Sequence, residues 1–299
     1  MAEPVTEPRL RVVQLNIGSL IEPGWEERRH EVVAWLHRLQ PDVVCLEEVW
    51  EDATTPNTAG GIAAAMPEHR WHWRFGGDRF GPTMWPDRDL LFGSAVLSRW
   101  PIDTATHHRL PTAGDDSFVD NVPWELFHVT TAGLDVFACH LAPAPTHGDH
   151  RRAQVLAIVD IIAAARGSKD ELGRHGQKRA AMPAILCGDF NAEPGSDEIR
   201  FLSSLAVLDG RTAFFQDAWR VAGDGPGYTQ DWRTNALADE MNLHRKRIDY
   251  VFVGDPFQRE GRAGRVLSAE LAFDHQLTGV DASDHFGLVV DIVWPDRPT

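Results

Sequence analysis

The 299-residue sequence predicts an α/β fold in which two β-sheets pack face to face and helices cover their outer sides. Three observations predict it. Short apolar runs of strand length dominate the chain, only a few segments show helical periodicity, and no stretch has the composition of an interdomain linker. We therefore expect one domain over residues 1–299, with an ordered core at about 9–296 and a short N-terminal tail.

The chain opens with a predicted strand, a helix and a second strand. Leu10–Ile17 and Asp42–Val49 are apolar runs, and Glu26–Leu39 between them places its apolar residues near helical spacing. Pro41 ends that helix. The other predicted strands are Arg70–Phe75, Ser94–Ser98, Val122–Thr130, Leu134–His140, Ala184–Cys187, Ile248–Val253, Val266–Ala272 and Leu288–Trp294. The other predicted helices are Asp149–Ala165 and Ser196–Leu205. The main predicted loops are Asn57–Arg70, Gly76–Leu91, Asp103–Asn121, Gly167–Arg179 and Gly223–Asn242.

The charge balance excludes some functions. Lys and Arg number 29 against 44 Asp and Glu, which gives a formal net charge of −15. Such a surface repels phosphate backbones at long range, so a protein that coats nucleic acid is excluded. A nuclease is not, because a bound metal can make a catalytic site locally positive.

The cysteines and the N-terminal sequence indicate where in the cell the protein is expected to be. Cys45, Cys139 and Cys187 are an odd number, lie far apart and sit in apolar runs, so we expect free, buried thiols. The N-terminus lacks the basic start and apolar core of a signal peptide, and no run has the roughly 20 apolar residues of a membrane helix. These features predict a soluble, cytoplasmic protein without a membrane span, and no protein partner is inferred.

Polar residues recur where predicted strands end. Each is Asn, Asp, Glu or His, and burying such a side chain without a partner costs a few kcal/mol. If the strand ends converge, they form an oxygen-rich pocket suited to a hard cation such as Mg²⁺ or Mn²⁺. The residues are Asn16, Glu47, Glu48, His140, Asp189, Asn191, Asp249, Asp284 and His285.

An ordered set of motifs resembles the endonuclease/exonuclease/phosphatase superfamily, which has the deoxyribonuclease I-like fold. In chain order the motifs are QLNIG, LEEVW, SAVLSRWPI, CHL, the Arg151–Gln154 pair, CGDFNAEP, RIDYVFV and SDHFGLVV. The resemblance covers almost the whole chain. It implies a four-layer αββα sandwich of two mixed sheets, and divalent-metal-dependent hydrolysis of a phosphodiester or phosphomonoester.

The resemblance also implies roles for the strand-end residues. Glu48 resembles the principal metal carboxylate, with Asn16 and Asp284 on the metal side, whereas Glu47 stands where the family has Gln and is expected to be a nearby or solvent-facing acid. His285, oriented by Asp249, or else Asp189, activates the water. Asn191 and His140 are expected to stabilise the phosphoryl oxygens. The implied catalytic residues are His140, Asp189, Asn191, Asp249 and His285.

Several readings of function stay open. The histidine of CHL disfavours an abasic-site repair enzyme, because such endonucleases usually have tyrosine in this region. A nuclease that cleaves DNA or RNA is the nearest alternative to a small-molecule phosphoesterase, and a non-catalytic metal-binding or scaffold protein is the alternative from another class. Arg99 is a candidate phosphate contact and Trp85 a candidate aromatic wall for the substrate.

Overall fold

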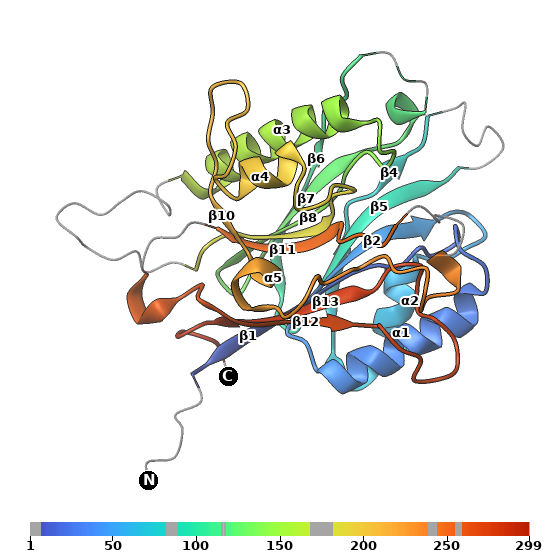
Figure 1. Cartoon of the computed structure of the whole chain (residues 1–299). Coiled ribbons are helices and arrows are strands. Elements are labelled where there is room, and N and C mark those ends of the chain that lie inside the picture. Colours follow the sequence, from blue (N-terminus) through green and yellow to red (C-terminus); the bar gives the residue numbers. More distant parts are fainter. Residues whose placement is uncertain are drawn as a thin grey trace, which may run out of the picture.

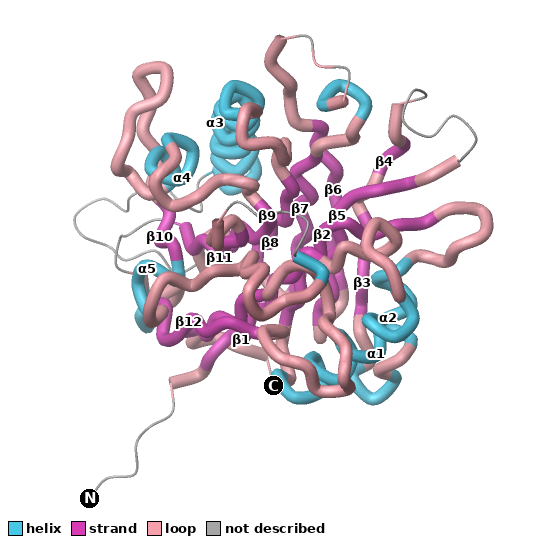
Figure 2. The backbone as a smooth tube through the Cα atoms, turned by 45° about the vertical axis from the view of Figure 1, so that its right-hand side comes forward, coloured by secondary structure: helices cyan, strands magenta, loops and turns pink. Residues whose placement is uncertain are grey.

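The computed structural model of the chain describes residues 7–81, 89–114, 116, 118–167, 182–238, 244–254 and 259–298. Two β-sheets lie face to face in the middle of the molecule, and helices cover the outer side of each (Figure 1). The same layers are visible after rotation, with helices on either side of the strands (Figure 2). The predicted four-layer αββα sandwich of two mixed sheets is confirmed.

Sheet 1 is built from strands near both ends of the chain. Its order is β12-β13-β1-β2-β5-β3, and β4 also pairs with β5. β1 runs parallel to β2 on one side and antiparallel to β13 on the other, so the first and last strands are neighbours. The strands are β1 (Arg9–Asn16), β2 (Val43–Glu51), β3 (His72–Phe75), β4 (Asp78–Arg79), β5 (Leu91–Ser98), β12 (Val266–Ala272) and β13 (Gly287–Val293).

Sheet 2 is built from the middle of the chain. Its order is β10-β11-β9-β8-β7-β6. β8 and β9 are parallel, and the other neighbouring pairs are antiparallel. The strands are β6 (Ile102–Arg109), β7 (Glu125–Thr131), β8 (Leu134–His140), β9 (Ile185–Asp189), β10 (Phe215–Asp217) and β11 (Asp249–Gly254).

The helices form the two outer layers. α1 (Trp25–Leu39) and α2 (Thr58–Ala64) cover sheet 1, whereas α3 (Gly148–Arg166) and α4 (Asp197–Leu202) cover sheet 2 (Figure 1). α5 (Ala218–Ala222) packs beside β11 and β12 and contributes to the core between the sheets. Short 3₁₀ helices lie at Pro67–His69, Val119–Asn121 and Glu260–Arg262. None of the helices in the described ranges is long and apolar enough to cross a membrane.

Alternation along the central strands explains their apolar runs. In β1, Leu10 and Val12 face the core between the sheets, while Val13 and Leu15 face the core beneath α1. Because both sides of the strand are buried, the sequence reads as a continuous apolar run. Polar residues in such a run are therefore conspicuous, and they gather at one end of the sandwich.

The strand registers bring those polar ends together. Asn16 at the end of β1 lies opposite Glu47 of β2. In sheet 2, Asp189 of β9 is flanked by His140 on β8 and Asp249 on β11. The carboxyl ends of both parallel pairs thus lie at the same edge of the sandwich, which is where polar groups from the two sheets meet.

Three segments that the sequence predicts as loops contain regular structure. The two-residue strand β4 lies within 76–91. β6 begins at Ile102 and overlaps the loop predicted at 103–121, and it escaped prediction because it is an edge strand whose side chains are mostly exposed. α2 lies within 57–70, where two glycines lower helix propensity. The Asn57 side chain caps α2 by accepting a hydrogen bond from the Gly60 amide.

Candidate active site

The structure brings together all eight residues predicted for catalysis and metal binding. Asn16 Nδ2 donates to Glu48 Oε1 at 3.0 Å and to Asp189 Oδ2 at 3.2 Å, which joins the two sheets. Around this link lie the imidazoles of His140 and His285, each within 4 Å of Asp189. The remaining members are Asn191, Asp249 and Asp284. We call these eight residues the catalytic cluster.

A β-bulge turns two consecutive glutamates into the space between the sheets. The register of β2 against β5 shifts between Leu46 and Val49, and Glu48 has a left-handed φ of 56°. In a regular strand, neighbouring side chains point to opposite faces, so both glutamates could not turn inward without this irregularity. Ser19 Oγ donates to the Glu48 carbonyl at 2.5 Å and secures the turn.

Glu47 is buried rather than solvent-facing. It has no solvent exposure, and its Oε2 accepts a hydrogen bond of 2.8 Å from Gln14 Nε2. The same Gln14 nitrogen donates to Asp249 Oδ1 at 2.9 Å. Burial raises the pKa of Glu47 well above its usual value, and Gln14 opposes the rise. Gln14 and the buried state of Glu47 were missed from the sequence, because nothing in an apolar run tells which buried polar groups will meet across two sheets.

His285 and Asp249 form an oriented pair. His285 Nδ1 lies 2.8 Å from Asp249 Oδ2, and the carboxylate fixes the tautomer that leaves Nε2 directed at Asp189 and Asp284. Burial lowers the pKa of His285, but Asp249, Asp284 and Asp189 outweigh it and raise the pKa well above its usual value. These acids thus favour the charged imidazolium, and Nε2 is the ring nitrogen that faces Asp189 and Asp284.

Asp189 and His140 have pKa values shifted toward their neutral forms. Burial raises the pKa of Asp189 to about 7, and the nearby Asp249 adds to the rise. Burial lowers the pKa of His140, whose Nε2 lies 3.6 Å from Asp189 Oδ2 and 4.0 Å from Glu48 Oε1. A carboxyl group with a pKa of about 7 that lines a pocket, as Asp189 does, is suited to acid–base chemistry.

Asn191 sits on a sharp turn directly after β9. Its φ is 49°, in the left-handed region that Asn tolerates better than most residues. The Asn191 amide donates to Asp189 Oδ1 at 2.8 Å, and its side-chain nitrogen donates to the Leu141 carbonyl at 3.0 Å. These bonds fix the Asn191 side chain at the pocket and leave its second side-chain N–H for a ligand.

The cluster has the donor chemistry of a divalent-cation site. Glu48 and Asp284 each keep only 16% of their side-chain surface exposed, and burial raises the pKa of Glu48, with Asp284 adding to the rise. Carboxylates gathered at low exposure repel one another, and a cation relieves that repulsion. Asp189, Asp249 and His285 also offer potential ligand atoms within 4.8 Å of one another.

A large pocket opens onto the cluster. Its volume is 1710 Å³, and it is lined by Glu48, His140, Asp189, Asn191, Asp284 and His285 together with apolar side chains. Asn16 and Asp249 lie behind this surface and are almost fully buried. The cluster thus has members that line the pocket and members that lie directly behind them.

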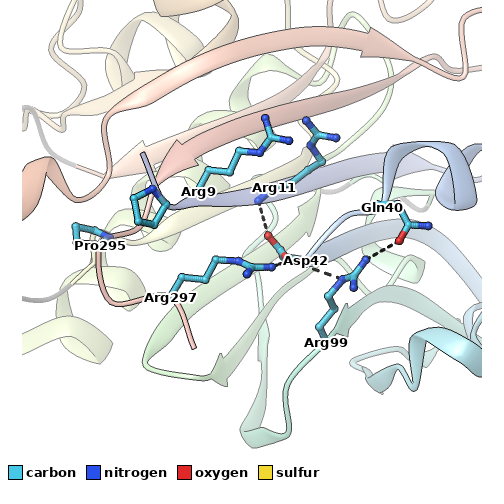
Figure 3. A pocket seen from close by; sticks show the side chains of 8 residues that line it. Arg9, Arg11, Gln40, Asp42, Arg99, Pro295 and Arg297 are labelled. Atoms are coloured by element: carbon cyan, nitrogen blue, oxygen red, sulfur yellow. Dashed lines mark hydrogen bonds and ion pairs between the residues drawn. The ribbon is translucent and has the colours of Figure 1, made fainter. Parts of the chain in front are cut away.

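Arg99 lies away from this pocket. It follows β5 at the end of the sheet where β2 begins, and its Nε donates to the Pro41 carbonyl and lies 3.7 Å from Asp42. Figure 3 shows Arg99 beside Asp42 in a separate depression. Glu48 lies six residue steps beyond Asp42 along β2, which corresponds to roughly 20 Å. The structure thus does not bring Arg99 to the catalytic cluster, and Trp85 lies outside the described residues.

Comparisons with known proteins show which family and relatives the chain resembles. A family model described as the Endonuclease/Exonuclease/phosphatase family matches residues 13–285. An inositol phosphosphingolipids phospholipase C from Saccharomyces cerevisiae is 24% identical over 278 residues, covering 82% of this chain and 51% of that protein. Nocturnin from Xenopus laevis is 24% identical over 289 residues, covering 92% of this chain and 66% of that protein. The chain thus spans between about half and two thirds of the length of these curated relatives.

Solved structures share the fold. An endonuclease/exonuclease/phosphatase from Beutenbergia cavernae superposes with a TM-score of 0.66 at 22% identity, covering 95% of this chain and 71% of that one. The human Nocturnin catalytic domain with a bound sulfate anion superposes with a TM-score of 0.64 at 21% identity, covering 95% of this chain and 93% of that one. D. rerio TDP2 complexed with a single-strand DNA product superposes with a TM-score of 0.65 at 17% identity, covering 96% of this chain and 99% of that one.

Proposed function

Because the chain belongs to the endonuclease/exonuclease/phosphatase family, we propose that it is a divalent-metal-dependent hydrolase that cleaves a phosphodiester or phosphomonoester bond by attack of water. The observation that carries the proposal is the catalytic cluster. The 2.8 Å Asp249–His285 pair and the Asn16–Glu48 pair gather at a pocket large enough for a substrate.

Mg²⁺ or Mn²⁺ is the cofactor we propose, held by Glu48 with Asn16 and Asp284 as further oxygen donors. The supporting observation is the set of oxygen ligands at low exposure, which suits a hard cation. When bound, the ion neutralises phosphate charge and steadies the leaving oxygen.

The residues around the ion position supply proton transfer and hydrogen bonds. His285 Nε2, with Nδ1 held by Asp249, accepts the proton of the attacking water in one arrangement, and Asp189 accepts it in the other. Asn191 and His140 donate hydrogen bonds to the phosphoryl oxygens. If His285 is the base, His285→Ala lowers turnover by roughly 10²–10⁴-fold. Near-normal turnover in that variant assigns the base to Asp189.

A nuclease is the second candidate. The structural likeness to D. rerio TDP2, whose structure holds a single-strand DNA product, favours it. The net charge of −15 argues against it, because polynucleotide binding draws most of its affinity from cationic side chains. We also propose a cytoplasmic, reducing location, since Cys45, Cys139 and Cys187 are free and buried.

The test is hydrolysis on one panel of substrates, with divalent metal and with EDTA. The panel contains supercoiled plasmid, single-stranded DNA and RNA, bis-(p-nitrophenyl) phosphate, p-nitrophenyl phosphate and a choline phospholipid. Asp189→Ala/His285→Ala is the inactive reference, and Arg99→Gln, away from the pocket, is the matched control that retains activity. Cleavage of small esters with intact plasmid supports a small-molecule phosphoesterase. Plasmid nicking that the double variant abolishes supports the nuclease, and metal binding without hydrolysis points to a scaffold protein.

A further inference from the structure

One side of the pocket is an aromatic surface that includes a catalytic imidazole. Phe80 and Phe92 have ring centroids 4.9 Å apart, and Trp50 contacts Phe92 edge-on at 6.3 Å. The His140 ring lies 6.3 Å from Phe92 and 5.5 Å from Trp124. All five line the same pocket as the catalytic cluster. We call Trp50, Phe80, Phe92 and Trp124 the aromatic wall.

Apolar side chains continue this surface to the rim of the pocket. Phe118 and Ile21 both line the pocket, and they remain 44% and 50% exposed. Leu20 and Val122 lie deeper along the same lining. Large apolar side chains exposed in one concave region mark a binding site more often than scattered ones do. This surface and the cluster line one pocket, so a ligand that reaches the cluster has room to extend along the apolar side chains.

The charges around the pocket oppose a long polyanion. Among the described lining residues, the lysine and arginine are Lys246 and Arg151. Arg151 is committed to Glu198 and to backbone carbonyls. A polynucleotide needs a row of cations along its backbone, and this lining does not supply one. The acidic residues of the lining outside the catalytic cluster are Glu22, Asp116 and Glu193.

We propose that the aromatic wall binds an alkyl chain esterified to the scissile phosphate, so that the substrate is an amphiphilic phosphoester. The chain lies against Phe80, Phe92 and Trp50 and extends toward Phe118, while the phosphoryl group meets His140 and the rest of the cluster. This inference rests on the proposed phosphoesterase function and names its substrate class.

The test measures binding of alkyl phosphates in MgCl₂ by calorimetry, below their micelle concentrations. The probes are methyl, butyl and octyl phosphate, which share one headgroup. Each fully buried methylene tightens binding by up to about fourfold, so we expect octyl phosphate to bind roughly 10- to 200-fold tighter than butyl phosphate. Phe80→Ala and Phe118→Ala are expected to reduce that ratio severalfold. Phe214→Ala removes a 39% exposed phenylalanine outside the pocket lining and is expected to keep it.

The outcomes separate this proposal from the hydrolytic one. Equal affinities for butyl and octyl phosphate overturn the alkyl-chain proposal. The proposal is also overturned if Phe214→Ala reduces the octyl-to-butyl affinity ratio as much as Phe80→Ala and Phe118→Ala do. Tighter binding of thymidine 5′-monophosphate than of octyl phosphate assigns the wall to a nucleobase instead. Because affinity is compared in the inactive Asp189→Ala/His285→Ala variant as well as in the wild type, and hydrolysis is assayed separately, chain-length-dependent affinity without hydrolysis by the wild type keeps the alkyl site and rejects the enzyme. Hydrolysis is then compared between a monomeric short-chain phospholipid and a phospholipid embedded in vesicles. The comparison shows whether the alkyl chain of the substrate enters the pocket from solution or from a bilayer.

Discussion

Gln14 connects Glu47 to Asp249, the acid that holds the His285 imidazole. One side-chain nitrogen donates to both Glu47 and Asp249, so a neutral amide separates two carboxyl groups that would otherwise repel each other. Asp249 in turn holds His285. Gln14 has no solvent exposure and does not line the pocket, so it acts on the reaction only by positioning Asp249.

Replacing Gln14 tests that positioning. Gln14→Leu removes the donor while keeping the volume close, and we expect turnover to fall by roughly tenfold or more because Asp249 loses its anchor. The accompanying shift in the pH profile of kcat distinguishes positioning from lost stability. Ser98→Ala removes a buried hydrogen bond to Thr131 and serves as the control. An unchanged pH profile in Gln14→Leu would contradict the assignment.

Glu48 offers the sharpest test of the cation site. Glu48→Gln keeps the shape but removes the negative charge, and we expect Mg²⁺ or Mn²⁺ to bind at least about tenfold more weakly. Calorimetry on the metal-free protein measures the change directly. Glu51→Gln is the matched control, since Glu51 lies on the same strand and bonds Asn57 outside the cluster. Equal affinities in the Glu48 variant and the wild type would remove Glu48 from the ligand set.

At the scale of elements, α1 secures the two loops that flank the cluster. Its buried Arg28 donates to the carbonyls of Ile17, Gly18 and Ser19 after β1. The same guanidinium donates to Glu22, Pro23 and Ala282. The loop that carries Ser19, and hence the Glu48 bulge, is thereby tied to the loop that precedes Asp284.

Removing this clamp is expected to be costly. Arg28→Met leaves several carbonyls without a donor, so we expect the free energy of unfolding to drop by at least about 3 kcal/mol. Arg29→Met changes the next residue, whose exposed pair with Glu26 is worth little, and is expected to stay within about 0.5 kcal/mol of wild type. Denaturant titration of both variants measures the difference. Similar stabilities would show that the loops hold their shape without Arg28.

Prediction from sequence succeeds for the long central strands and misses shorter or more exposed elements such as α2 and β6. The central strands can be recognised as apolar runs. The edge strand β6 has exposed side chains such as Thr104, Thr106 and His107, so its sequence resembles that of a loop. Strand-end residues such as Asp189 could be identified because their positions coincide with familiar motifs. The bond between Gln14 and Glu47 could not, because it depends on how two sheets are placed face to face.

At the scale of the whole molecule, Glu125 joins the sheets. It lies on β7 of sheet 2, yet its Oε1 accepts a hydrogen bond from the Ser94 amide of β5 in sheet 1. Gly93 allows this approach, because a Cβ there would collide with the carboxylate. His107 Nε2 of β6 lies 3.1 Å from the other carboxylate oxygen. The hydrogen bond to Glu125 is the main cause that raises the pKa of His107, although burial opposes it.

This pair predicts a pH-dependent stability. A raised folded-state pKa means that the contribution of His107 is complete below about pH 6.5 and is lost as pH rises through the folded-state value. We compare the free energy of unfolding of the wild type with that of His107→Gln at pH 6 and at pH 9. The advantage of the wild type is expected to be larger at pH 6, by up to about 1 kcal/mol, because solvent screens an imidazole that is 30% exposed. Denaturant titration in EDTA measures this. His108→Gln should show the opposite trend, because burial lowers the pKa of His108.

The position of β1 between β2 and β13 bears on when the proposed site can assemble during synthesis. Leu10 pairs with Ile292, so the contact joins residues that lie far apart in the sequence, and closing so long a loop is slow. During translation, Asn16 and Glu48 leave the ribosome long before Asp284 and His285. A nascent chain that has not reached these residues has two of the three proposed metal-binding residues and no imidazole beside Asp249, so we expect it to be inactive until His285 has been synthesised.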